Sequence, residues 1–538
     1  MKSKISLMGN AMNRSSVQLL FLRIPLVFAL AWFALSLQAR AQTCRQGCNF
    51  YNGILFFGDD TLMANTGYLN TAIGELALHN NTTGHDNTAS GANALDENTT
   101  GSNNTASGSR ALEDNSTGGD NTADGSYALA INTAGSDNTA NGMKALYSNT
   151  IGNYNTATGE SALFSNTTGG DNTAVGRLAL SSNSTGGYNT GIGSGALLNN
   201  TASYNTAVGF HALFSNTTGS YSTANGRMAL NNNTTGSYNT ATGESALLSN
   251  TSGGDNTAVG RLALSRNTTG GFNTGIGSGA LLNNTAAYNT AVGFHALYST
   301  TIGTFNTANG SLALATDTTG AGNTAIGLAA LSANTTGSDN VALGTAAGTN
   351  ATTGSFNVYI GAGMNGVAGE SNACYIQSID GQTSASGVAV LINSSGKLGT
   401  ATSSRRFKEN IKPMDKASET LFALKPVTFR YKKELDAQGL QQWGLVAEDV
   451  QRVNPALVAL DKEGRPYSVR YEQVNAMLLN EFLKEHKAFV EEQGKVQEQG
   501  ATIARLEQQV ASLTAGLQKV NAQLELTKSA PQTVLNNQ

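Results

Sequence analysis

The sequence repeats itself every 17 residues from Asn70 to beyond Asn340, and so short a period leaves the chain very few folds. The consensus unit is Asn-Thr-Ala-x-Gly-x-x-Ala-Leu-x-x-Asn-Thr-Thr-Gly-x-x, and seventeen units follow one another, two of them one residue short. A unit of this length cannot bury an apolar face alone, so its stability has to come from stacking on neighbouring copies. The period therefore predicts a mostly β chain, with a β-solenoid rather than a globular enzyme over residues 70–361.

Composition favours an ordered solenoid over a disordered chain. Only 13% of the residues are charged, the formal net charge is −4, and Leu and Ala recur along the repeats. Disordered segments instead combine high net charge with few apolar residues. The repeats carry no basic stripe, so nucleic acid is not expected as a partner. His211 and His295 are copies of one repeat position and are expected to be surface residues, so no metal or other cofactor is expected.

Each unit is expected to form one coil that contains two short strands. Asn-Thr-Ala-x-Gly and x-x-Ala-Leu have the pattern of strands, and the Gly and Asn residues between them suit turns with positive φ. Ala at the third position and Leu at the ninth are the regular core side chains. Asn at the first and twelfth positions indicates either a hydrogen-bonded ladder between coils or simple turn chemistry. Other apolar side chains, such as Val175, would be left for neighbouring chains to cover.

Residues 1–41 have the pattern of a secretory signal peptide. Basic residues precede the apolar run 17–37, and small residues at Ala39 and Ala41 suit cleavage. The alternative is a retained membrane anchor, but Arg23 and Pro25 interrupt the run. After cleavage we expect no membrane span, and a secreted or cell-surface location.

Residues 42–69 carry aromatic side chains that the consensus lacks, and they are expected to form an N-terminal cap on the solenoid. Export permits disulfides. Cys44 and Cys48 could pair with each other or between chains of an oligomer, and the sequence leaves their pairing and the state of Cys374 open.

The composition changes abruptly at Arg405, where charged residues return and the 17-residue period has ended. Residues 362–402 are expected to form a β connector, 403–470 a small α+β domain, 471–526 a helix with a coiled coil, and 527–538 a flexible tail. Apolar residues spaced alternately three and four apart mark the coiled coil. Their mix of β-branched residues and Leu does not select two strands over three. These seam residues are Ile503, Leu506, Val510, Leu513, Leu517, Val520 and Leu524.

Several rungs share the pattern of Asn172-Thr173-Ala174-Val175-Gly176 and Asn323-Thr324-Ala325-Ile326-Gly327. In this pattern the repeats resemble those of trimeric autotransporter adhesin heads, and the resemblance covers about half of the chain. It implies a left-handed parallel β-roll in which three chains pack side by side.

The C-terminal region carries three characteristic segments, which are Ser403-Ser404-Arg405-Arg406-Phe407-Lys408, Leu424-Lys425-Pro426-Val427 and Trp443-Gly444-Leu445-Val446-Ala447-Glu448-Asp449. In these segments the region resembles the endosialidase intramolecular chaperone family. The resemblance implies a module that trimerises, templates the folding of the β-fibre ahead of it and then cuts itself off with a Ser/Lys pair, which Ser403 and Lys408 match here. In phage members the residue after the nucleophile is commonly Asp, where this chain has Ser404.

The residues alone do not decide whether Ser403 and Lys408 form a catalytic pair. A Ser hydroxyl is a poor nucleophile until a base takes its proton, and a desolvated Lys can act as that base. Side chains five residues apart share neither a helix face nor a strand face, so a bend or another chain would have to bring them together. The other interpretation is a solvated basic surface that includes Arg405, Arg406 and Lys412.

These patterns predict an exported, fibrous, adhesin-like homotrimer whose C-terminal domain directs assembly and acts as a serine endopeptidase on itself near Ser403. Its partners would be copies of itself and a cell-surface or glycan receptor. The alternatives are a phage-derived tail fibre or tailspike, and a solenoid that binds glycan or ice along its column of Thr residues. Nearly identical rungs would also let chains align out of register, which a C-terminal assembly domain would prevent.

Overall fold

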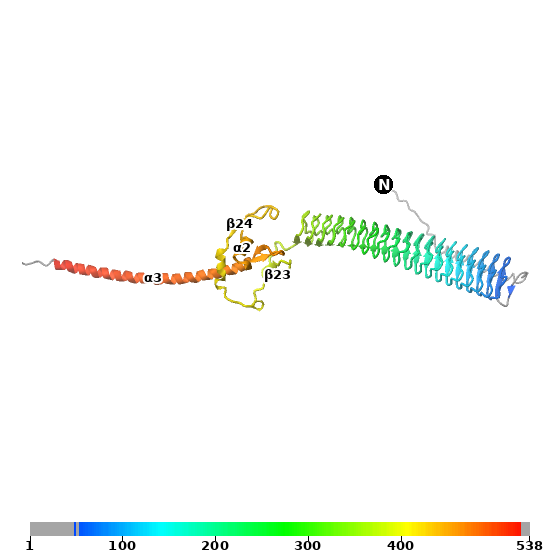
Figure 1. Cartoon of the computed structure of the whole chain (residues 1–538), viewed down its shortest axis with the longest axis horizontal. Helices are drawn as coiled ribbons and strands as arrows, with labels where there is room; N and C mark the ends of the chain where they lie inside the picture. The colour runs from blue at the N-terminus through cyan, green and yellow to red at the C-terminus, as the bar shows by residue number, and fades with distance from the viewer. Residues whose placement is uncertain (1–47, 50–52, 529–538) are drawn as a thin grey trace, which may run out of the picture. The chain divides into compact units, whose positions relative to one another are not determined.

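The computed structural model describes residues 48–49 and 53–528 (Figure 1). The predicted signal peptide, its alternative as a membrane anchor, Cys44 and most of the predicted tail lie outside the described residues. The chain divides into two compact units, with the boundary between Gln382 and Thr383. Each unit is described here by itself.

The N-terminal unit is built around one sheet of 21 strands. Strand β1 (Cys48–Asn49) pairs with β2 (Ile54–Phe57) antiparallel, and from β2 onward every strand pairs in parallel with the next one in the sequence. The strands from β3 to β21 each belong to one turn of a solenoid, which confirms the predicted parallel β-solenoid and extends it two turns beyond the consensus units. They are β3 (Thr71–Ile73), β4 (Thr88–Ser90), β5 (Thr105–Ser107), β6 (Thr122–Asp124), β7 (Thr139–Asn141), β8 (Thr156–Thr158), β9 (Thr173–Val175), β10 (Thr190–Ile192), β11 (Thr206–Val208), β12 (Thr223–Asn225), β13 (Thr240–Thr242), β14 (Thr257–Val259), β15 (Thr274–Ile276), β16 (Thr290–Val292), β17 (Thr307–Asn309), β18 (Thr324–Ile326), β19 (Val341–Leu343), β20 (Val358–Ile360) and β21 (Cys374–Ile376).

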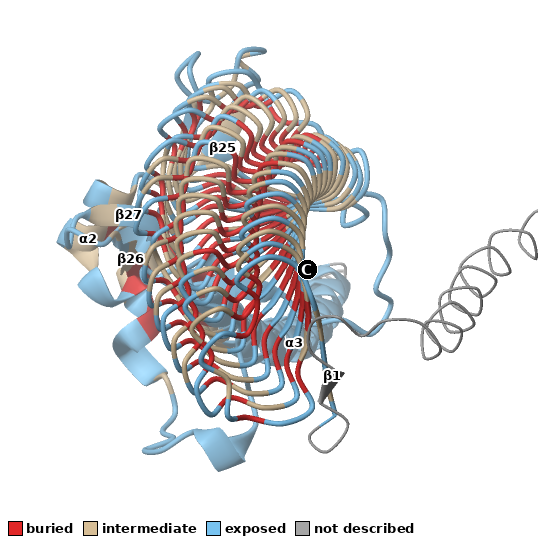
Figure 2. Ribbon diagram, turned by 90° about the vertical axis from the view of Figure 1, so that its right-hand side faces the viewer, coloured by how far each residue is buried: buried red, intermediate tan, exposed pale blue. Residues whose placement is uncertain are grey.

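The solenoid core is a set of continuous columns of small and medium apolar side chains. Figure 2 shows these buried residues stacked inside the coil from turn to turn. The third-position Ala and the ninth-position Leu are fully buried, as predicted, and the eighth-position Ala joins them, as in Ala72, Ala77 and Leu78 of one turn. Burying one Leu side chain stabilises the fold by about 1.5–3 kcal/mol. Repetition of this small core is therefore what stabilises the unit.

The second strand expected in each coil is absent from the described turns, and that part of the prediction is wrong. The x-x-Ala-Leu segment forms a turn in which the seventh and ninth residues have left-handed backbones, as in Leu76 (φ 58°) and Leu78 (φ 53°). A left-handed backbone costs an L-residue roughly 1–2 kcal/mol. The narrow coil needs this sharp reversal, and burial of the Leu side chain together with the bond from the Leu78 N–H to the Ala94 carbonyl (3.0 Å) offsets the cost.

The buried Asn residues satisfy both interpretations left open by the sequence. Asn98 Nδ2 donates to Asn81 Oδ1 of the preceding turn (2.7 Å) and to the Gly101 carbonyl of its own turn (3.0 Å). Asn104 Nδ2 does the same at the first position, donating to Asn87 Oδ1 (3.1 Å) and to the Gly118 carbonyl (2.9 Å). Each column of Asn side chains therefore forms a hydrogen-bonded ladder between turns, and the same side chains also hydrogen-bond within their own turns.

The C-terminal unit is a set of short elements followed by one long helix, α3 (Tyr471–Lys528). Its buried apolar core is small, made by Val450, Leu457, Val458, Val469, Val474 and Met477. The coiling of this helix with a partner stays a prediction. The remaining elements are β22 (Val390–Ile392), β23 (Leu398–Thr400), η2 (Arg405–Phe407), η3 (Asp415–Ala423), β24 (Val427–Phe429), β25 (Gln442–Gly444), α2 (Ala447–Val453), η4 (Pro455–Leu457), β26 (Val458–Leu460) and β27 (Pro466–Val469).

Candidate functional site

Ser403 and Lys408 lie on either side of a short 3-10 turn. The turn, η2, is closed by a bond from the Lys408 N–H to the Arg405 carbonyl, after which the backbone of Lys408 is extended (φ −124°, ψ 137°). The Arg406 guanidinium lies 4.6 Å from the centre of the Phe407 ring. The chain therefore bends between Ser403 and Lys408.

A single copy does not complete a Ser/Lys dyad. Both side chains are exposed, and no hydrogen bond joins them in the part of the chain that the structure describes. A lysine works as a general base when its surroundings remove water from the amine. Such surroundings would have to come from outside this copy.

Sequence reasoning missed a buried polar cluster between η3 and α3. Ser418 is fully buried, and its hydroxyl accepts from Asn480 Nδ2 (2.6 Å), lies 3.4 Å from Lys484 Nζ and contacts the Glu481 carboxylate. Lys484 Nζ also pairs with Glu481 (2.7 Å), and hydrogen bonds from Lys484 and Ser418 lower the pKa of Glu481. The sequence could show Asn480, Glu481 and Lys484 on one helical face, but nothing marked Ser418, more than sixty residues away, as their partner.

The Ser418 cluster joins two elements and is not a second catalytic pair. Lys484 is held by carboxylates at Glu481 and Glu419 (3.8 Å), and the buried Ser418 hydroxyl is already hydrogen-bonded. A general base has to be free to take a proton, and a nucleophile has to be reachable by its substrate. The cluster therefore fixes η3 on α3.

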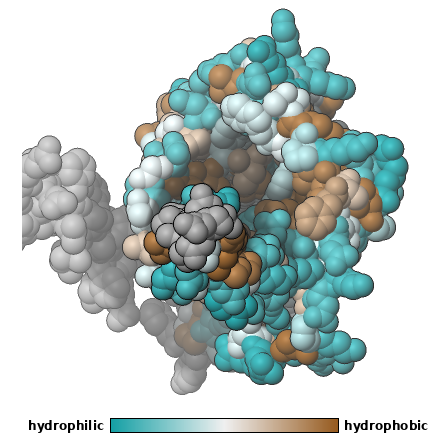
Figure 3. All heavy atoms as spheres, turned by 90° about the vertical axis from the view of Figure 1, so that its left-hand side faces the viewer, coloured by the Kyte–Doolittle hydropathy of each residue, from teal (hydrophilic) through white to brown (hydrophobic). Residues whose placement is uncertain are grey.

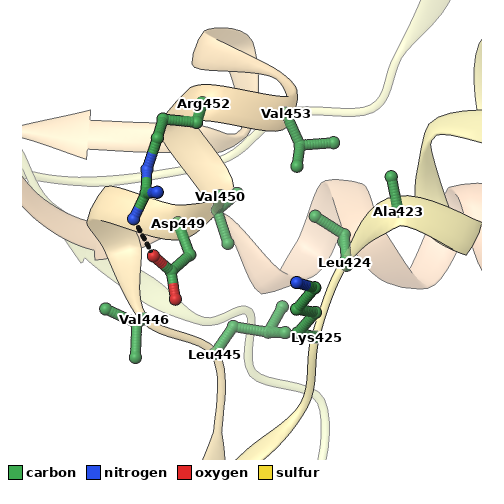
Figure 4. Close-up of a pocket in the computed structure, with 9 residues that line it drawn as sticks. All are labelled: Ala423, Leu424, Lys425, Leu445, Val446, Asp449, Val450, Arg452 and Val453. Carbon is green, nitrogen blue, oxygen red and sulfur yellow. Dashed lines mark hydrogen bonds and ion pairs between the residues drawn. The ribbon is translucent and has the colours of Figure 1, made fainter.

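A shallow pocket lies between α2 and the segment 423–425 (Figure 4). Figure 4 shows the Asp449–Arg452 ion pair on one side of the pocket and Lys425 on the other. Neither Ser403 nor Lys408 lines it. The described residues contain no group of three or more His, Cys, Asp or Glu side chains placed to hold a metal ion.

The C-terminal unit leaves most of its large apolar side chains in water. In α3 the seam residues are 50–68% exposed, and Phe482, Phe489 and Val496 extend the same seven-residue spacing toward the start of the helix. In the view of Figure 3, apolar residues interrupt the polar surface in several places. Soluble monomers rarely expose this much apolar surface, so the pattern is typical of a face that another chain covers.

The comparisons with known proteins identify the module at this site. Residues 403–459 match the family model described as chaperone of endosialidase, and the match begins at Ser403. A parallel β-solenoid in this chain is therefore followed by a segment that matches the endosialidase chaperone family. No curated protein and no solved structure matches the chain. Among the described residues, no helix combines the length and apolar character needed to cross a membrane.

Proposed function

We propose that this protein is an exported, fibrous homotrimer whose solenoid forms a surface stalk or adhesive head and whose C-terminal module directs assembly and then cuts itself off near Ser403. The observation that carries the proposal is the match of residues 403–459 to the endosialidase chaperone family. The bare apolar surface of the same unit supports it, because assembly would bury that surface.

Assembly depends in this proposal on the seam of α3. The seam residues recur every seven residues and are all exposed in one copy, as a coiled coil requires. A parallel bundle would bring the N-terminal ends of the helices, and with them the modules of neighbouring chains, close together. The assembled modules would then surround Lys408 and remove the water that a lone copy leaves on it.

Leu513→Asp should abolish assembly, because it places a charge in the middle of the proposed seam, where burial of an unpaired carboxylate is very unfavourable. Sedimentation should show an oligomer for the wild type and a single chain for the variant. Ser512→Asp, which adds the same charge beside the seam, is the control and should assemble normally. An oligomeric Leu513→Asp protein would contradict the role of the seam.

The cleavage chemistry follows from the two side chains. Lys408 Nζ, as the neutral amine, takes the proton of Ser403 Oγ, and the oxygen attacks the carbonyl carbon of a peptide bond near Ser403. An ester forms on Ser403, and the leaving amine takes the proton from Lys408. Water then hydrolyses the ester, so the net reaction is hydrolysis of one peptide bond.

Ser403→Ala and Lys408→Ala should each eliminate cleavage, because each removes one of the two reacting groups. Denaturing electrophoresis with mass spectrometry should show two fragments meeting near Ser403 for the wild type and one intact chain for both variants. Ser404→Ala is the control and should still be cut. An uncut wild-type chain would remove the peptidase from the proposal and leave the assembly role.

A phage-derived tail fibre is the second candidate, and the family match favours it because such modules terminate phage fibres. The two candidates differ in the fate of residues 1–41. Mass spectrometry of the mature N-terminus should find these residues removed from an exported protein and retained in a virion component. A glycan or ice ligand for the Thr column is a third, weaker proposal, since Thr stands alone on most of the strands.

A further inference from the structure

The outward side of the solenoid sheet has two distinct edges. In β3 to β20 the third residue of each unit is buried at the middle of its strand. The second and fourth residues of the unit point outward and form what we call the strand face. The seventeenth residue of the preceding unit, two positions before the strand face, forms the leading edge, and the sixth residue, two positions after it, forms the trailing edge. Both edges lie at the bends that flank the strand, and residues of both edges are exposed, as in Tyr204 and Phe210 at β11.

The two edges of one rung are complementary in charge. At β9 the leading edge is Asp171 and the trailing edge is Arg177, and both are exposed. Arg177 pairs with Glu160 along its own edge (3.4 Å), but Asp171 makes no ion pair among the residues that the structure describes. The duplicated block repeats this arrangement at β14 with Asp255 and Arg261.

Two further rungs of this region, β11 and β12, carry aromatic side chains on their edges. At β11 an aromatic ring lies on each edge, Tyr204 and Phe210, and at β12 the leading edge carries Tyr221 and the trailing edge Arg227. The leading-edge rings stack on one another at 4.9 to 5.1 Å, which leaves their rims rather than their faces open to a neighbour. The strand face between the edges carries half-exposed Val175 and Ile192.

Within one chain the edges of a rung cannot satisfy each other, because the strand face lies between them. A second copy, parallel and at the same level, would bring its trailing edge against the leading edge of the first. Asp171 would then meet Arg177, Tyr204 would meet Phe210, and Tyr221 would meet Arg227. Because the two contacting surfaces differ, the contact is heterologous and closes into a ring by rotation.

We propose that the partner of the strand face is a second copy of this chain, docked leading edge to trailing edge, and that the edge residues of β8 to β16 set the register. This inference deepens the homotrimer proposed above and rests on it. A slip of one rung toward the N-terminus would set Asp171 against Glu160 and Asp255 against Glu244, and like charges at a contact are unfavourable. A slip of five rungs would restore complementarity through the duplicated block, so the C-terminal module has to exclude that register.

The test is a cross-linking experiment on the full chain with cysteines on both edges of β11. Tyr204→Cys combined with Phe210→Cys should give products larger than one chain on non-reducing denaturing gels. The matched control combines Tyr204→Cys with Ser194→Cys, which stands on the trailing edge one rung earlier, and it should cross-link far less. Bands formed by the native cysteines are identified in wild-type protein treated in the same way.

Charge reversal gives a second, independent readout. Asp171→Arg with Asp255→Arg should weaken assembly, because both new cations would meet trailing-edge arginines. Asp120→Arg with Asp137→Arg changes the same edge by the same charge opposite the uncharged Ser126 and Met143, and it should assemble normally. Sedimentation of each variant measures the loss.

The outcomes separate this inference from the proposed function. A wild-type chain that sediments as a single copy overturns the homotrimer. A wild-type oligomer that cross-links equally through Ser194→Cys and Phe210→Cys, or that tolerates Asp171→Arg with Asp255→Arg as well as the control pair, overturns the edge-to-edge register while the homotrimer stands.

Discussion

Asn149→Ala is expected to lower the free energy of unfolding of the repeats by about 3 kcal/mol. Asn149 Nδ2 donates to Asn132 Oδ1 (2.7 Å) and to the Gly152 carbonyl (2.9 Å), and Asn149 Oδ1 accepts from Asn166 Nδ2 (2.8 Å). The change leaves Asn132 Oδ1 and one N–H of Asn166 unpaired in a fully buried column, and each such group costs roughly 1–3 kcal/mol. Denaturant unfolding followed by circular dichroism measures the loss.

The control for this ladder prediction is Asn141→Ala, which removes an exposed amide from strand β7 of the same region. It should shift the unfolding midpoint very little, because surface changes away from special contacts are usually worth less than 0.5 kcal/mol. Equal midpoints for the two variants would mean that the ladder contributes nothing beyond ordinary turn chemistry.

Most of the solenoid could be predicted from the repeat, because the same residue pattern recurs in every turn. The 17-residue period predicted the parallel stacking of the turns, and the Ala and Leu residues at the third and ninth positions predicted the core. The left-handed backbone at Leu78 could not be predicted, because Leu at a regular spacing is equally typical of a strand and residue preferences disfavour positive φ for it. Only closure of a narrow coil around Ala and Leu selects that conformation.

The residues of the candidate site could be proposed from the sequence, but the arrangement of their side chains in space could not. The positions Ser403 and Lys408 came from a resemblance, and in one copy both side chains are exposed with no hydrogen bond between them among the described residues. The Ser418 cluster depends on how η3 lies on α3, a contact between segments distant in the sequence. No local pattern encodes such a contact.

The edges of the solenoid change how register is expected to be set. The sequence gives nearly equal rungs, and an assembly domain alone would then have to align the chains. In the edge-to-edge arrangement proposed above, Asp171 and Asp255 disfavour a slip of one rung toward the N-terminus, and the C-terminal module would exclude the other registers, the five-rung slip among them. During assembly, the C-terminal module would align the chains approximately, and the edge residues of the rungs would then select the final register.

One residue breaks the twelfth-position ladder in a way that makes stability depend on pH. Asp317 is fully buried where most other turns have Asn, and its Oδ1 accepts from Asn334 Nδ2 (2.8 Å) while Oδ2 has no partner. In Asn turns the amide nitrogen at this place donates to the Gly carbonyl three residues on, as Asn334 does to Gly337 (2.9 Å). An ionised Oδ2 cannot donate, but a protonated one can. Burial accordingly raises the pKa of Asp317 from 3.8 to about 7, although hydrogen bonds from Asn334 and Gly320 oppose the shift.

Asp317→Asn is therefore expected to stabilise the solenoid at pH 8 and to change it little at pH 4. Between the unfolded and folded pKa values the folded chain holds a proton that the unfolded chain has lost, so wild-type stability falls as pH rises across that range. Over roughly three pH units the wild-type free energy of unfolding falls by about 4 kcal/mol at most. The Asn side chain avoids this loss, because its amide donates a hydrogen bond at every pH. Thermal melts at both pH values measure the difference. Asp339→Asn, an exposed carboxylate in the next turn, is the control and should show no such gain. Equal pH dependence in wild type and Asp317→Asn would show that Asp317 does not carry the buried proton.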